Sequence, residues 1–199
     1  MINYAHETIV DGDLGGCGRG EVGDPQTFVP SVWAGLIEMY DAKSVLDIGA
    51  GFGYASRWFR NQGCEVVGVE GSGGIAEQGV TTLEPHDYTT GPFCRDNGPG
   101  FDLCWCSEFA EHVEQQYEAN WLADVKRCRV LALTAAPPWH PGHHHVNLQT
   151  SEYWIKRLAE HGFDYAPTAT NWLKSVAADA HPYSYFSFRG LVFERRAND

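Results

Sequence analysis

The clearest hydrophobic pattern of the chain lies between residues 44 and 70. An apolar run at 44–48 predicts a strand that is buried on both faces, and a glycine-rich stretch follows it. Apolar residues at helical spacing then predict an amphipathic helix over 54–62. A second predicted strand, 64–69, ends at the carboxylate of Glu70. A βαβ unit with an acid at the tip of its second strand is an arrangement that binds nucleosides.

Short apolar runs and helical periodicity alternate along the rest of the chain. Further helices are predicted at 30–40, 111–127 and 151–161. The remaining strands are predicted at 80–83, 101–106, 130–134, 163–166 and, antiparallel to the others, within 185–195. The fold class predicted from this order is α/β, a Rossmann-like, doubly wound, mostly parallel seven-stranded sheet with an antiparallel last strand. Residues 167–182 are predicted to be a long connection.

The N-terminal region, 1–29, has turn signals and little periodicity. We expect an irregular arm there, either a loose terminus or a lid that folds over the ligand. Because 199 residues suit one domain, we expect a single domain over 1–199 without a separate substrate domain.

The glycines of the first turn follow an acid in the pattern Asp47-x-Gly49-x-Gly51-x-Gly53. The dinucleotide fingerprint G-x-G-x-x-G does not fit, because Tyr54 and Ser56 stand where its third glycine is needed. The pattern resembles motif I of the class I S-adenosylmethionine-dependent methyltransferases. This resemblance implies a single methyltransferase domain with S-adenosylmethionine as cofactor and S-adenosylhomocysteine as product.

The resemblance also implies roles for individual residues. Asp47 and the three glycines would cradle the methionine and ribose portions of the cofactor, and Glu70 would bind the ribose hydroxyls. Asp87 stands where the family has an acid that accepts a hydrogen bond from the adenine amino group. Ser107, at the end of the strand predicted at 101–106, is grouped with these cofactor-binding residues.

Two groups of side chains are candidates for the chemistry, because both follow predicted strands at the carboxyl edge of the sheet. One group is Glu108, Glu111 and His112, which a helix starting at Glu108 would place on one side. The other is the run His143, His144 and His145, of which at most two side chains can reach one site. A histidine or glutamate of these groups would act as general base for methyl transfer to a hydroxyl.

A metal site is the alternative, although we expect a metal-free enzyme. The string E-x-x-E-H at 108–112 resembles the metal-binding motif of the small-RNA 3′-terminal 2′-O-methyltransferases, in which a later histidine completes the site. That resemblance implies a divalent ion held by Glu108, Glu111, His112 and His144, with the ion binding the two ribose hydroxyls of RNA.

A wider resemblance covers about residues 11–165. The segments SEFAEHV, TAAPPWHPGHHHVN and SEYWIKRLAEHGF are similar to a little-characterised group of class I methyltransferases of bacteria and viruses. This resemblance supports the fold and the cofactor, and it leaves the methyl acceptor unnamed.

Composition narrows the partners. With 26 acidic and 14 basic residues, the formal net charge of -12 disfavours a broad phosphate-binding face, although a local nucleic-acid groove stays open. Six scattered cysteines and the lack of a signal-peptide pattern predict a cytoplasmic protein without a membrane partner. We expect it to be a monomer or a homodimer. We expect a small-molecule or sugar-like hydroxyl acceptor; an RNA ribose is the alternative acceptor, and a non-catalytic adenosylmethionine-binding module is the alternative of another class.

Overall fold

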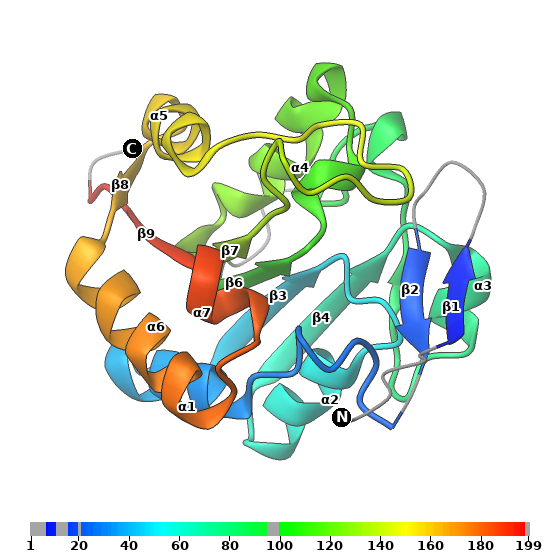
Figure 1. Ribbon diagram of the computed structural model, residues 1–199, viewed down its shortest axis with the longest axis horizontal. Helices are drawn as coiled ribbons and strands as arrows, with labels where there is room; N and C mark the ends of the chain where they lie inside the picture. The colour runs from blue at the N-terminus through cyan, green and yellow to red at the C-terminus, as the bar shows by residue number, and fades with distance from the viewer. Residues whose placement is uncertain (1–6, 11–15, 20, 95–99, 198–199) are drawn as a thin grey trace.

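The chain folds around one seven-stranded sheet with helices on both faces (Figure 1). The computed structural model describes residues 7–10, 16–19, 21–94 and 100–197. The strand order is β5-β4-β3-β6-β7-β9-β8. In chain order these strands are β3 (Ser44–Ile48), β4 (Glu65–Glu70), β5 (Glu84–Pro85), β6 (Phe101–Ser107), β7 (Cys128–Thr134), β8 (Phe163–Tyr165) and β9 (Leu191–Arg195).

The direction of the strands confirms the predicted fold class. Strand β3 pairs in parallel with both β4 and β6, while β9 runs antiparallel to β7 and β8. The chain passes from β3 outward through β4 and β5, and then returns to the other side of β3 as β6. This reversal of the winding direction creates a crevice at the carboxyl ends of β3 and β6, where ligands of open α/β sheets bind.

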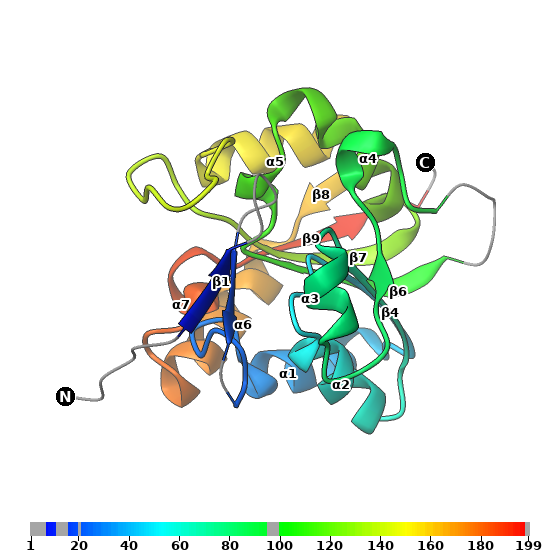
Figure 2. The same ribbon diagram turned by 90° about the vertical axis from the view of Figure 1, so that its right-hand side faces the viewer.

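The helices form two layers, one on each side of the sheet (Figure 2). They are α1 (Pro30–Tyr40), α2 (Tyr54–Asn61), α3 (Gly73–Glu77), α4 (Glu118–Val125), α5 (Ser151–Glu160), α6 (Pro167–Ala180) and α7 (Tyr185–Arg189). Side chains of β3 alternate between the layers: Leu46 packs in the core beneath α4 and α5, whereas Val45 packs in the core beneath α1, α2 and α6. None of the described helices is both long and apolar enough to cross a membrane.

The N-terminal region contains regular structure that its sequence pattern does not predict. Strand β1 (Glu7–Val10) pairs antiparallel with β2 (Gly16–Arg19), where we expected an irregular arm. The four-residue length and high glycine content of β2 remove the alternation that identifies a strand. The expectation for residues 1–6, 11–15 and 20 lies outside the described residues.

Three other expectations need correction. The predicted strand at 80–83 is wrong, because those residues form no strand; β5, which pairs with β4, begins at Glu84. The predicted connection at 167–182 is instead helix α6, in which Ala169, Leu173 and Ala177 form a buried stripe at four-residue spacing. The predicted helix at 111–127 is two 3-10 turns, η3 (Ala110–His112) and η4 (Gln115–Tyr117), followed by α4.

Candidate functional site

The turn after β3 has a backbone that requires glycine. Gly49, Gly51 and Gly53 have φ angles of 71°, 55° and 79°, a region that side-chain-bearing residues rarely adopt. A Cβ atom on Gly49 would also lie 2.6 Å from the Phe109 side chain. The turn can therefore approach the end of β6 closely only because glycine occupies these positions.

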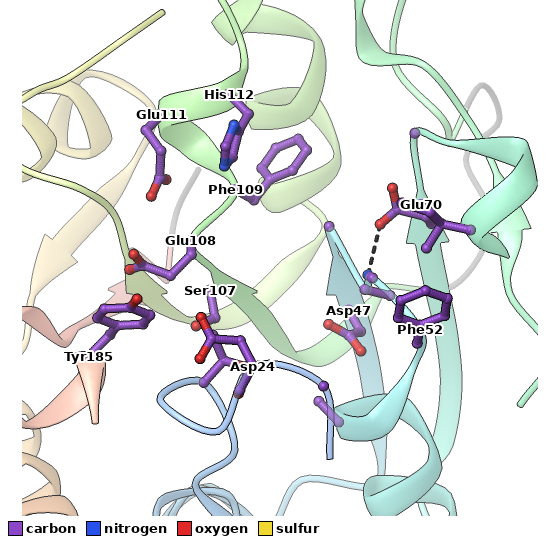
Figure 3. A pocket seen from close by; sticks show the side chains of 18 of the residues that line it. Asp24, Asp47, Phe52, Glu70, Ser107, Glu108, Phe109, Glu111, His112 and Tyr185 are labelled. Carbon is purple, nitrogen blue, oxygen red and sulfur yellow. Dashed lines mark hydrogen bonds between the residues drawn. The ribbon is translucent and has the colours of Figure 1, made fainter. Parts of the chain in front are cut away.

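Glu70 at the end of β4 is bonded to that turn (Figure 3). Its Oε2 atom accepts a hydrogen bond of 2.7 Å from the backbone N–H of Gly51. Its Oε1 atom accepts one of 3.0 Å from the N–H of Ser72, which precedes α3. These bonds fix the Glu70 carboxylate at the mouth of the crevice, beside the glycines, as the sequence predicted from its place in the βαβ unit.

Asp47 lies below the turn and is 2% exposed. Its Oδ2 atom accepts a hydrogen bond of 2.6 Å from the Ser56 hydroxyl in α2. Burial raises the pKa of Asp47 to about 6, although the bonds from Ser56 oppose this rise. Asp47 therefore ties β3 to α2 and also forms part of the wall of the cavity described below.

Asp87 and Ser107 are held by local hydrogen bonds. The Asp87 carboxylate accepts from the N–H and the hydroxyl of Thr89, at 2.8 and 2.9 Å, and so caps the 3-10 turn η2 (Tyr88–Thr90). The Ser107 hydroxyl lies 2.9 Å from that of Thr134 on the neighbouring strand β7. Both residues line the same cavity.

A cavity of about 1090 Å³ at the carboxyl edge of the sheet joins the candidate residues. With one exception, all the residues singled out from the sequence line it: Asp47, Gly49, Gly51, Glu70, Asp87, Ser107, Glu108, Glu111, His112, His143, His144 and His145. The exception is Gly53, whose Cβ position faces Thr81 and Leu83. The glycine turn and the histidine loop, about ninety residues apart in sequence, therefore share one ligand-sized space.

Glu108 does not begin a helix, contrary to the prediction. Its φ angle of 52° is incompatible with helical backbone, and η3 starts two residues later. The side chain forms an ion pair with Arg189, with 2.6 Å between Oε2 and the guanidinium nitrogen. The expected arrangement, with Glu108, Glu111 and His112 on one face of a helix, therefore does not form.

Glu111, His112 and His145 converge instead. One ligand atom of each lies within 4.8 Å of those of the other two. The Nδ1 atom of His112 lies 3.1 Å from the backbone oxygen of His144, and Nδ1 of His145 lies 2.9 Å from that of His140. Since a carbonyl oxygen only accepts, both imidazoles donate from Nδ1, and their Nε2 lone pairs remain for a proton or an ion.

The third member of this cluster, Glu111, is fully buried. Its Oε1 atom accepts a hydrogen bond of 3.0 Å from the N–H of Ala136, while Oε2 has no hydrogen bond of acceptable geometry from the described residues. Burial raises the pKa of Glu111, and the Glu108 carboxylate raises it further. Burial lowers the pKa of His112 to about 4, which keeps its ring neutral at physiological pH.

His143 and His144 lie outside the cluster. His144 adopts a φ angle of 50° and contributes its backbone oxygen to His112. His145 is placed by its neighbour Gly142, on which a Cβ atom would lie 2.4 Å from the imidazole ring.

Three residues near Glu108 were not predicted from the sequence. Asp24 and Tyr185 line the cavity, and Arg189 lies behind Glu108, with its guanidinium 4.2 Å from the centre of the Tyr185 ring. In the sequence, Asp24 was part of a turn signal and Arg189 part of a break in a strand pattern. Neither sequence pattern indicates the long-range contacts that bring these residues close to Glu108.

The sequence of residues 46–129 matches the family described as "Methyltransferase domain". This match covers the glycine turn, Glu70 and the end of β6, which are the parts that build the crevice. This part of the chain therefore has the sequence pattern of a methyltransferase domain. No curated protein sequence matches the chain.

Solved structures similar to this chain share its fold at low sequence identity. Magnesium protoporphyrin IX methyltransferase from Synechocystis PCC 6803, solved with bound S-adenosylmethionine, is 19% identical with a TM-score of 0.58, over 85% of this chain and 78% of that one. The plantazolicin methyltransferase BpumL, in complex with S-adenosylhomocysteine, is 10% identical with a TM-score of 0.56, over 84% and 83%. The methyltransferase domain of bacterial CtHen1 is 15% identical with a TM-score of 0.52, over 69% and 86%.

Proposed function

We propose that this methyltransferase transfers the methyl group of S-adenosylmethionine to a hydroxyl of a small or sugar-like acceptor. The observation that carries the proposal is the single cavity that runs from the Glu70 carboxylate to the imidazole of His112. Its glycine end fits a nucleoside, and its histidine end offers a proton acceptor. The sheet, with a core on each face, supports one domain built around this cavity.

The cofactor occupies the glycine end in this proposal. Gly49 and Gly51 approach the methionine and ribose portions, and Glu70 accepts hydrogen bonds from the ribose hydroxyls. Asp87 and Ser107 complete the adenosyl and methionine contacts. Asp47 acts through Ser56 by holding β3 and α2 in place, and Gly53 contributes its backbone conformation, since its Cβ position faces away.

His112 is the general base of the proposal. A bond forms between the acceptor oxygen and the methyl carbon while the carbon–sulfur bond of the sulfonium breaks, and the hydroxyl proton passes to Nε2 of His112. The lowered pKa of His112 keeps this nitrogen unprotonated at neutral pH, and the bond from Nδ1 to His144 fixes the tautomer. The products are S-adenosylhomocysteine and a methyl ether.

Replacing Glu70 tests the cofactor end. We expect Glu70→Ala to weaken binding of S-adenosylhomocysteine by about 1–3 kcal/mol, since the ribose hydroxyls lose an ionised acceptor. Glu65→Ala is the matched control, because Glu65 is an exposed residue at the start of the same strand. Calorimetric titration measures both. Equal affinities of the two variants would contradict the role given to Glu70.

Replacing His112 tests the chemistry. Methyl transfer from labelled S-adenosylmethionine would first be screened against sugars, amino sugars, phenols and a short RNA. On the best acceptor, we expect His112→Gln to lower kcat by about 10²–10⁴-fold, because glutamine can hydrogen-bond but cannot accept the proton. Cofactor affinity should stay as in the unaltered protein. A variant with unchanged kcat would exclude His112 as the base.

A second candidate is a metal-assisted transfer to an RNA ribose, and the Glu111, His112 and His145 cluster favours it. Two imidazoles, each of which donates its Nδ1–H to a backbone carbonyl, and a buried carboxyl oxygen suit zinc, manganese or iron. Such an ion would supply Lewis acidity to the acceptor hydroxyl. Glu111, His112 and His145 would hold it, in place of the expected set with Glu108 and His144.

Metal binding can be measured without turnover. If the cluster holds an ion, Mn²⁺ or Zn²⁺ should raise the melting temperature of the protein, and His145→Ala should abolish this rise. His143→Ala is the control, since His143 lines the cavity outside the cluster. Calorimetry that finds no ion bound to the unaltered protein, together with methyl transfer unaffected by EDTA, would rule out this candidate.

A further inference from the structure

The cavity is strongly biased toward negative charge. Of the described residues that line it, seven are acidic and none is lysine or arginine; the acids are Asp24, Asp47, Glu70, Asp87, Glu108, Glu111 and Glu114. A phosphate or carboxylate on the acceptor would therefore meet repulsion without a compensating cation. This charge distribution favours an acceptor that is uncharged or positively charged.

Asp24, Glu108 and Tyr185 lie together at one end of the cavity (Figure 3), and Arg189 is ion-paired with Glu108; we call these four residues the Asp24 corner. Burial raises the pKa of the Tyr185 hydroxyl, and the charges of Asp24 and Glu108 raise it further, so both carboxylates act on this hydroxyl. The two carboxyl groups face one guanidinium, and burial raises the pKa of Glu108. A ligand cation beside them would lower the cost of burying the negative charge.

The geometry of Glu108 indicates where that ligand charge would lie. Its Oε2 atom is paired with Arg189, and the two side chains are only 15% and 13% exposed. Its Oε1 atom is buried and receives no hydrogen bond of acceptable geometry from the described residues. Glu108 is also held in a left-handed conformation, with φ at 52°, which a non-glycine residue rarely adopts. An oxygen placed in this way at a cavity wall is suited to accept from an N–H donor of the ligand.

A second buried carboxylate oxygen faces the same space. Glu111 lines the cavity, is fully buried, and has an Oε2 atom without a hydrogen bond from the described residues. Burial raises the pKa of Glu111, and the charge of the neighbouring Glu108 raises it further. Adding a cation beside Glu108 would lower the cost of both.

The segment that carries Asp24 is held to the C-terminal part of the chain through Gln26. The side-chain amide of Gln26 donates to the backbone oxygen of Tyr183, at 2.8 Å. In return, the backbone N–H of Tyr185 donates to the backbone oxygen of Gln26, at 3.0 Å. The Asp24 carboxylate also accepts from the N–H of Gln26, at 2.9 Å. The corner is therefore built before the acceptor enters, and Arg189 is a positioning residue that orients Glu108.

We propose that the Asp24 corner binds a protonated amine of the acceptor, so that the substrate is an amino alcohol or amino sugar whose hydroxyl is methylated. This proposal rests on the proposed function, because it concerns the acceptor half of the same cavity. It distinguishes the acceptor from phosphate-bearing molecules such as RNA.

The test uses three probes that differ at one carbon: 6-amino-6-deoxyglucose, glucose and glucose 6-phosphate. Their binding to the full chain saturated with S-adenosylhomocysteine is measured by calorimetry or ligand-observed NMR. We expect the amine to bind about tenfold more tightly than glucose and the phosphate to bind most weakly, since a desolvated charge-assisted hydrogen bond is worth about that ratio. Added salt should reduce the preference for the amine.

Asp24→Asn and Glu108→Gln provide the matched variants. Each should bring the affinities for the amine and for glucose to the same value, with S-adenosylhomocysteine affinity as the check that the variant is folded. Tightest binding of the phosphate, equal binding of all three probes, absence of amine binding at millimolar concentration, or a preference that survives in both variants would overturn the proposal. Loss of S-adenosylhomocysteine binding by the unaltered protein would instead contradict the proposed function.

Discussion

The left-handed backbone of Gly49, Gly51 and Gly53 is the constraint on which the cofactor end depends. It turns the chain from β3 into α2 tightly enough for the Gly51 N–H to reach Glu70, and it lets the turn lie against Phe109. Because β4 and β6 flank β3, one turn sets the relative positions of Glu70 and the residues after β6. The cavity between them is a consequence of this arrangement.

The acceptor end depends on contacts that are distant in sequence. Glu108 and Arg189 are 81 residues apart, and Gln26 and Tyr183 are 157 apart. The histidine loop is held to η3 by hydrogen bonds from the backbone N–H groups of Val146 and Asn147 to the backbone oxygen of Glu111. Loops positioned by a rigid sheet commonly carry the determinants of specificity. Here these contacts bring loops from distant parts of the chain together at one end of the cavity.

The sequence predicted the sheet and its winding because these follow from local patterns. The motif around Asp47 and the tip of β4 lies within one βαβ unit, whose geometry is fixed by strand and helix periods. The arrangement of the residues after β6 was predicted less well. A helix starting at Glu108 fails because of a φ angle that spacing cannot show, and the choice of His145 over His144 depends on Gly142 and a backbone carbonyl. Asp24 and Arg189 were missed because only tertiary contacts give them a role.

Under the proposed function, the crevice beside the glycine turn binds S-adenosylmethionine and not a dinucleotide. Calorimetric titration of the unaltered chain with S-adenosylmethionine, S-adenosylhomocysteine and NAD measures this choice of ligand. We predict one site per chain that binds the first two ligands and does not bind NAD. Saturable binding of NAD, with no heat from either adenosyl ligand, would contradict it.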